Sequence, residues 1–182
     1  MIRLLTALLL LCGSVIPALT ATGAPANYEI EVLVFETRLP DLEGAELWTQ
    51  AQPANESAQT ASPREMAPTE EFSSIAEALR ADGRYRVMLH KRWVQPAEPR
   101  SSGSAVALTS WDRELDGALR FYMSRFLHVE LKLLFQPRST AIGGEVAPTY
   151  VLEEQRRVRS NDLHYFDHPK FGALVRIRPA AG

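Results

Sequence analysis

The sequence predicts an α+β fold, in which a single domain has a mostly antiparallel sheet of five or six strands and one main helix. Several stretches alternate apolar and polar residues with the period of a β-strand, and one stretch repeats apolar residues at helical spacing. Short, turn-like links separate the strand patterns in the second half of the chain. We expect residues 25–182 to form this domain after a cleaved signal peptide over residues 1–24.

The first residues have the three parts of a secretory signal peptide. Arg3 supplies a positive charge, residues 4–11 are apolar apart from Thr6, and small residues crowd positions 18–26. The apolar run is far shorter than the roughly 20 residues that cross a bilayer, so we expect export to the periplasm and no stable membrane insertion. The alternatives are a short membrane anchor and a lipid anchor at Cys12.

Composition excludes further classes of protein and of site. Cys12 is the sole cysteine of the chain, so removal of the signal peptide leaves no disulfide, thiolate metal site or cysteine nucleophile. The 20 basic and 22 acidic side chains nearly balance, which argues against a general nucleic-acid binder.

The first half of the domain alternates between strand and helix patterns. Residues 28–36 predict a strand whose second half is buried on both faces. Residues 49–69 are polar and rich in proline, and we expect a mobile surface loop there. A helix follows from Glu70, with one apolar stripe and with Gly83 placed to end it. The stripe consists of Phe72, Ile75, Ala76 and Leu79.

The second half is predicted to be strands. Residues 85–95 alternate, which places Trp93 on one face and Arg84, Arg86, His90 and Arg92 on the other. Residues 119–135 also alternate, but one strand of that length would span roughly 55 Å, so we expect a bend or bulge near Arg125. Residues 139–148 predict a hairpin loop, and residues 150–160 and 171–178 predict the last two strands, with 161–169 as their connection.

The densest group of polar side chains lies near the C-terminus. His164, Asp167 and His168 suggest a metal site, with His90 or His128 as a further ligand. The alternative is that His164 and Asp167 hydrogen-bond the backbone in an ordered connection. Nucleophile and phosphate-binding motifs are absent from the sequence, so we assign no catalytic residue, cofactor or metal.

Binding is better supported than catalysis. Arg84, Arg86 and Arg92 recur along one strand, and guanidinium groups pair well with carboxylates. The rings of Trp48, Trp93 and Trp111 suit stacking on sugars, although Trp93 shares its face with apolar residues, which favours a core position. The simplest explanation of the arginine row is a solvated sheet face. The candidate ligand-binding residues are Arg84, Arg86, Arg92, Trp93, His164, Tyr165, Asp167 and His168.

Four stretches of the chain resemble the CsiV family of peptidoglycan-binding proteins from Gram-negative envelopes. They are YEIEVLVFE at 28–36, YRVMLHKRWVQP at 85–96, LDGALRFYMSRFLHVELKLLF at 115–135 and RRVRSNDLHYFDHPKFGALVRI at 156–177. The segment HYFDHPKFG at 164–172 is the most specific, and Val158 and Phe166 depart from the usual family residues. We therefore expect residues 25–182 to form a CsiV-like domain.

The resemblance implies a non-enzymatic periplasmic protein that binds peptidoglycan and supports cell-wall assembly and cell shape. Its further partners would be outer-membrane lipoprotein activators of penicillin-binding proteins. Two alternatives stay open. One is a metal-dependent envelope hydrolase centred on His164, Asp167 and His168, and the other is a protein–protein adaptor for peptidoglycan synthase activators.

Overall fold

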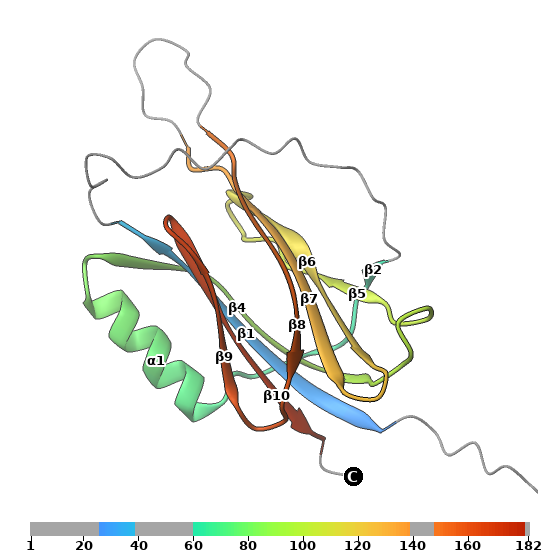
Figure 1. Ribbon diagram of the computed structural model, residues 1–182. Coiled ribbons are helices and arrows are strands. Elements are labelled where there is room, and N and C mark those ends of the chain that lie inside the picture. Colours follow the sequence, from blue (N-terminus) through green and yellow to red (C-terminus); the bar gives the residue numbers. More distant parts are fainter. Residues whose placement is uncertain (1–25, 39–59, 139–147, 181–182) are drawn as a thin grey trace, which may run out of the picture.

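The computed structural model describes residues 26–38, 60–138 and 148–180, and these form two five-stranded sheets and one helix (Figure 1). The expected signal peptide, the first part of the expected loop at 49–69 and nearly all of the expected hairpin loop at 139–148 lie outside the described residues.

The first sheet has the strand order β3-β4-β1-β10-β9, and all its neighbours pair antiparallel. Its strands are β1 (Asn27–Thr37), β3 (Glu65–Met66), β4 (Tyr85–Pro96), β9 (Leu163–His168) and β10 (Phe171–Pro179). The second sheet has the order β2-β5-β6-β7-β8, and its short β2–β5 pair is parallel. Its strands are β2 (Thr60–Ala61), β5 (Ala105–Ala107), β6 (Leu115–Met123), β7 (Leu127–Phe135) and β8 (Tyr150–Val158).

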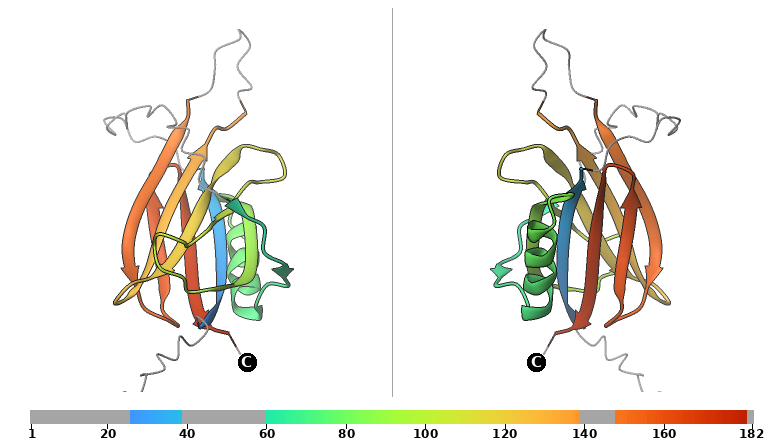
Figure 2. Two further views of the ribbon diagram at one scale, coloured as in Figure 1. Left: turned by 90° about the vertical axis from the view of Figure 1, so that its right-hand side faces the viewer. Right: turned by 90° about the vertical axis from the view of Figure 1, so that its left-hand side faces the viewer.

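The two sheets pack face to face, and helix α1 (Glu70–Ala81) lies on the outer face of the first sheet (Figure 2). The larger core lies between the sheets and includes Ile30, Val32, Val34, Trp93, Leu119, Phe121, Leu131, Leu133 and Phe135. A smaller core of Leu33, Phe72 and Ala76 lies between the helix and the first sheet. Strand β1 is therefore buried on both faces, as its sequence predicted.

The predicted helix is confirmed, and so is the negative charge predicted for its first turn, but its C-cap is Asp82 and Gly83 does not adopt the positive φ of a helix-ending glycine. Thr69 is the N-cap, and its side chain accepts a hydrogen bond from the backbone N–H of Phe72. Glu70 and Glu71 occupy the first turn, where the helix dipole favours negative charge. The helix ends at Ala81, two residues before Gly83.

The predicted antiparallel arrangement with one main helix is confirmed, but the described strands form two five-stranded sheets and not one sheet of five or six. Strands β2, β3, β5 and β9 lie where no strand was expected, and the 119–135 pattern belongs to two strands. The chain reverses at residues 124–126 and β6 pairs antiparallel with β7 along its whole length. Arg125 lies in that turn, so the break was placed correctly and its kind was not. Alternation continues across a hairpin because both strands direct their apolar residues into the same core.

Two segments that were predicted to have no regular structure contain strands. Residues 163–168 of the expected connection are strand β9, which pairs with β10. Residues 60–61 and 65–66 of the expected loop pair with β5 and β4. Histidine and aspartate are uncommon in strands, so the sequence of β9 gave little sign of the pairing that β10 imposes on it.

A β-bulge overturns the predicted row of arginines on β4. Val34 pairs with Leu89 and Phe35 pairs with Val87, so Met88 is the extra residue, and the alternation changes face there. Arg86 consequently contacts Asp112 and Glu114 next to the second sheet. Arg92 instead contacts the carbonyl of Ala67 near the start of the helix, on the opposite face of the first sheet.

An arginine from β8 closes one open side of the sandwich. The guanidinium of Arg156 lies 4.2 Å from the ring centre of Phe166 on β9. It also donates a hydrogen bond of 2.9 Å to the carbonyl oxygen of Tyr165. Because β8 and β9 are the outermost strands of their sheets, this contact joins the two sheets at their edges.

Glu31 ties the start of the helix to β1. Its carboxylate is 3% exposed, and it accepts hydrogen bonds from the backbone N–H of Thr69 at 2.9 Å and from its hydroxyl at 2.7 Å. Nε2 of His90 lies 2.9 Å from the same carboxylate. Burial raises the pKa of Glu31, but the hydrogen bonds from His90 and Thr69 outweigh burial and leave the pKa lowered.

We predict that Glu31→Ala lowers the free energy of unfolding at pH 7 by about 1–3 kcal/mol, because it leaves buried donors without an acceptor. A lowered folded-state pKa stabilises the protein above the unfolded value of 4.5, and that contribution disappears as the pH falls. The difference between wild type and variant should therefore shrink between pH 7 and pH 3 in denaturant titrations. Glu77→Ala, on the exposed face of the helix, is the control, and an equal loss there would contradict the prediction.

Candidate functional site

A pocket of about 300 Å³ opens at the end of the first sheet, where β1 ends, β4 begins and β9 turns into β10. The last turn of the helix forms one wall. The lining residues are Phe35, Thr37, Leu79, Tyr85, Tyr165, Asp167, His168 and Pro169, and we call this site the aromatic pocket. Its volume is at the lower end of the range for small-molecule sites.

Three stacked or edge-on rings form the pocket's apolar part. The ring of Tyr165 lies nearly parallel to that of Phe35, with 6.2 Å between centroids and 7° between planes. Tyr85 meets Phe35 edge-on at 5.7 Å. Phe35 is buried, whereas Tyr165 is 44% exposed. Phe35 thus forms a floor on which two tyrosines are held with their rings partly accessible.

Gly172 makes room for Tyr165. A Cβ atom at this position would lie 2.7 Å from Cε2 of Tyr165 and 3.1 Å from Cζ of Phe35. A side chain on β10 would therefore displace the tyrosine ring from its place over the sheet. This accounts physically for the glycine that ends the distinctive segment at 164–172.

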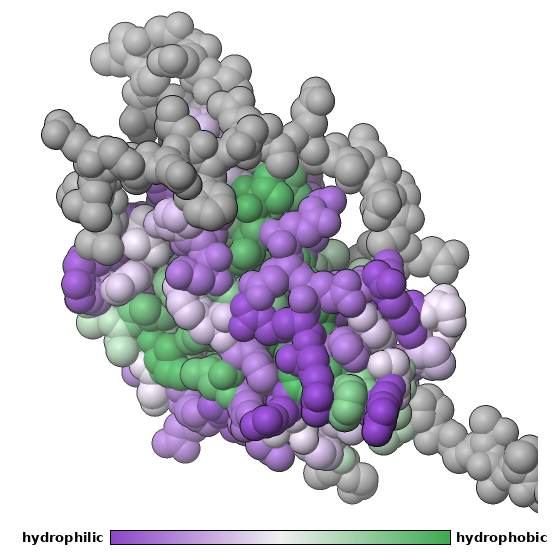
Figure 3. All heavy atoms as spheres, in the orientation of Figure 1, coloured by the Kyte–Doolittle hydropathy of each residue, from purple (hydrophilic) through white to green (hydrophobic). Residues whose placement is uncertain are grey.

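Apolar surface surrounds the pocket. The helix covers β4 and β1, and it leaves part of the same face over β10 and β9 without helical cover. In the space-filling view, apolar surface gathers between α1 and the β9–β10 hairpin (Figure 3). Leu163, which is 43% exposed, and Tyr165 lie on this face of β9.

The polar side chains of the pocket include one carboxylate, that of Asp167, and one imidazole, that of His168. The hydroxyl of Tyr165 donates to Oδ1 of Asp167 at 2.6 Å. Burial, and then this hydrogen bond, raise the pKa of Tyr165, so its hydroxyl stays protonated. Burial lowers the pKa of His168, whose Nδ1 accepts a hydrogen bond from the backbone N–H of Lys170. The imidazole is therefore neutral at pH 7.

The structure brings together three of the predicted site residues, Tyr165, Asp167 and His168. Arg84 lies beside the pocket, because its guanidinium is 5.7 Å from the ring centre of Tyr85, and it pairs with Asp82. His164 lies at the other end of β9, where its Nε2 is 3.0 Å from the carbonyl oxygen of Arg159. The expected backbone hydrogen bond of His164 is thus present, although on a strand and not in a connection, whereas Asp167 accepts from the side chain of Tyr165.

The hypothesised metal centre is not formed. Strand alternation directs His164 and His168 to one face of β9 and Asp167 to the other. The two histidines are four residues apart on a strand, about 13 Å, which is too far for ligands of one ion. Within the described ranges no cluster of three His, Cys, Asp or Glu side chains could hold a metal ion.

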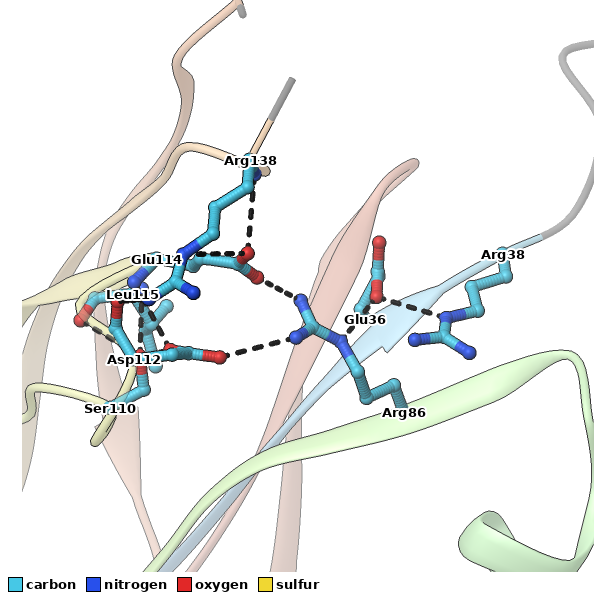
Figure 4. A network of polar contacts seen from close by, with 8 residues as sticks. All are labelled: Glu36, Arg38, Arg86, Ser110, Asp112, Glu114, Leu115 and Arg138. Carbon is cyan, nitrogen blue, oxygen red and sulfur yellow. Dashed lines mark hydrogen bonds and ion pairs between the residues drawn. The ribbon is translucent and has the colours of Figure 1, made fainter. Parts of the chain in front are cut away.

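Two of the predicted arginines already hold carboxylates of the protein itself. Arg86 bonds Glu36 at 2.7 Å, Asp112 at 3.2 Å and also Glu114 (Figure 4). Arg92 bonds Glu29 at 2.5 Å. A ligand carboxylate would have to displace these partners. We therefore remove both arginines from the candidate set.

Trp93 also leaves the candidate set. Its ring is 0% exposed in the core between the sheets, and its Nε1 donates to Oε1 of Gln95 at 2.6 Å. A buried ring has no face to offer a sugar in this conformation. The interpretation of Trp93 as a core residue is the one that its position supports.

Sequence reasoning missed the floor and one wall of the pocket. Phe35 and Tyr85 were assigned to strands, but their meeting depends on the β1–β4 register, in which Thr37 pairs with Tyr85. Antiparallel pairing of two recognised strands was the signal that could have placed the end of one beside the start of the other.

The comparison with protein families gives one match. A family model described as "Peptidoglycan-binding protein, CsiV" matches residues 62–180, which is more than half of the chain. The matched segment contains all pocket residues except Phe35 and Thr37. No curated protein and no solved structure matches the chain. Among the described residues, no helix is long and apolar enough to cross a membrane.

We predict that Gly172→Ala destabilises the protein by about 1–3 kcal/mol, because the new methyl group forces the Tyr165 ring off Phe35. Thermal unfolding measures the loss, and near-ultraviolet circular dichroism reports the displaced tyrosine. Gly83→Ala is the matched control, since a Cβ atom there meets nothing within 4 Å. Equal melting temperatures for the two variants would contradict the close packing described above.

A second prediction concerns the tyrosine hydroxyl. Asp167→Asn removes the negative charge beside Tyr165, so the pKa of Tyr165 should fall while burial still keeps it above the ordinary value of 10. Ultraviolet absorbance titration at alkaline pH follows tyrosinate formation. Tyr165→Phe identifies which of the five tyrosines gives the shifted signal. An unchanged titration in Asp167→Asn would show that the carboxylate does not act on this hydroxyl.

Proposed function

The chain belongs to the CsiV family of peptidoglycan-binding proteins, and we propose that it binds the cell wall in the periplasm through the aromatic pocket, without catalysing a reaction. The observation that carries this proposal is Tyr165, which is held partly exposed on Phe35 above a glycine.

The chemistry of the pocket suits an amino sugar. Peptidoglycan has sugar rings with apolar faces, and aromatic rings such as Tyr85 and Tyr165 provide flat apolar surfaces beside hydroxyl groups. Asp167 accepts hydrogen bonds, and sugar hydroxyl and amide groups donate them. Arg84 beside Tyr85 already pairs with Asp82, but its side chain is 62% exposed, whereas those of Arg86 and Arg92 are 27% and 19% exposed, so a carboxylate of a stem peptide can reach it.

Binding without cleavage fits the titratable groups of the pocket. Hydrolysis of a glycosidic bond uses a pair of carboxylates on either side of the bond. Asp167 is the single carboxylate among the residues that line the described pocket, and it already accepts from Tyr165. The pocket therefore supports holding a sugar better than cutting one.

The wider role follows from the family and from the expected export signal. We infer that the protein supports wall assembly and cell shape from the periplasm. Outer-membrane lipoprotein activators of penicillin-binding proteins are the protein partners that this role implies, so that wall binding and adaptor function are compatible.

We predict that the mature protein co-sediments with purified sacculi and that Tyr165→Ala weakens this binding about tenfold, which corresponds to roughly 1.4 kcal/mol of stacking and burial. Leu163→Ala is the matched control, because Leu163 is equally exposed on the same face of β9 and does not line the pocket. Its binding should stay within about twofold of wild type. Failure of wild type to sediment would end the proposal of direct wall binding, and full binding by Tyr165→Ala would move the site elsewhere.

A further inference from the structure

Trp111 is the most exposed large apolar side chain in the described chain, with 89% of its surface accessible. It lies between β5 and β6, inside the segment that matches the family model. Tryptophan is a residue that usually hides much of its ring, so one held almost wholly in water needs an explanation.

The turn that carries Trp111 is closely hydrogen-bonded. The Ser110 hydroxyl donates to Asp112 at 2.5 Å and accepts from the backbone N–H of Leu115 at 3.0 Å. The backbone N–H of Glu114 donates to Asp112 at 3.1 Å. Arg113 takes a φ of 60°, a left-handed conformation that closes the turn. These hydrogen bonds fix the backbone of the turn that carries the ring of Trp111.

The same turn is anchored to both sheets. Arg86 on β4 bonds Asp112 and Glu114, and it also bonds Glu36 on β1 (Figure 4). Arg138, which follows β7, donates to the carbonyl oxygen of Asp112 at 2.8 Å. An anchored turn loses little conformational freedom when its ring meets a ligand, and this preorganisation favours binding.

The anchors also place the turn relative to the aromatic pocket. Arg86 and Glu36 each follow a pocket residue, Tyr85 and Phe35 respectively. The turn and the pocket therefore lie at the same end of the first sheet, on its two opposite faces. A polymer with repeated units along its length can contact the turn and the aromatic pocket at the same time.

Arginine side chains and carboxylates are paired at this end of the first sheet. Four arginines at this end of the first sheet have exposed side chains, namely Arg38, Arg84, Arg113 and Arg138. Arg38, Arg84 and Arg138 pair with Glu36, Asp82 and Glu114, and their exposed guanidinium groups can also meet a carboxylate of an incoming polymer.

We propose that Trp111 stacks on a sugar ring of a peptidoglycan glycan strand and is thus a second wall contact, separate from the aromatic pocket. The inference rests on the proposed function, because the ligand is the same polymer. It assigns to the turn between β5 and β6 a role that the pocket alone does not supply.

Tryptophan fluorescence tests the contact directly. The chain has Trp48, Trp93 and Trp111, so in the mature variant Trp48→Phe the emission comes from a buried and an exposed ring. Iodide should quench the exposed ring of Trp111 and leave Trp93 bright. Adding glycan strands freed of their stem peptides should protect Trp111 from iodide. Unchanged quenching at a glycan concentration that saturates binding would overturn the proposal.

Sacculus sedimentation separates the two wall contacts. Trp111→Ala should weaken binding by five- to tenfold, and Trp111→Phe should restore most of it, while the melting temperature stays that of wild type. Wild-type binding by Trp111→Ala, together with loss in Tyr165→Ala, would overturn the Trp111 contact and leave the proposed function standing. Loss in Trp111→Ala with full binding by Tyr165→Ala would support Trp111 and reject the pocket.

A protein partner is the competing occupant of Trp111. If Trp111→Ala binds sacculi as wild type does but loses crosslinks to envelope proteins in cells, the ring serves a protein pocket and the proposal is wrong.

Discussion

Burial of β1 on both faces is the constraint on which the rest of the molecule depends. One face of the strand lies against the second sheet and the other lies against the helix. Glu31 uses the helix face to hold Thr69 at the helix start. At the far end of the strand, Phe35 forms the floor of the aromatic pocket and Glu36 anchors Arg86. A strand that must stay central therefore also fixes the two surfaces that we connect with function.

The sequence alone predicted the elements whose apolar pattern is strong, namely β1, the helix, β4 and β10. It failed where pairing overrides local preference. The bulge at Met88 moves Arg92 to the face opposite Arg86. Strand β4 buries apolar residues on both faces, so the alternation of apolar and polar residues in the sequence continues unchanged across the bulge. For the site, the segment at 164–172 drew attention to Tyr165 and Asp167, which line the aromatic pocket. Phe35 and Tyr85 could not be found, because their contact depends on strand register and not on residue type.

The two proposed wall contacts differ in how the fold supports them. Tyr165 rests on a packed ring and depends on a glycine in the neighbouring strand. Among the described residues no ring stacks on Trp111, and charged groups from both sheets hold its turn instead. Dispersion in one case and ion pairing in the other produce the same result, which is an aromatic surface that stays accessible without loosening the core.

The contact of Arg156 with β9 also bears on how the protein behaves in a crowded compartment. β9 is the outer strand of its sheet, and the carbonyl groups on such a strand invite pairing with a strand of another molecule. Arg156 occupies the carbonyl of Tyr165 and covers Phe166 with its guanidinium. The charged side chain thereby covers part of this edge, which disfavours pairing of β9 with a strand of another molecule.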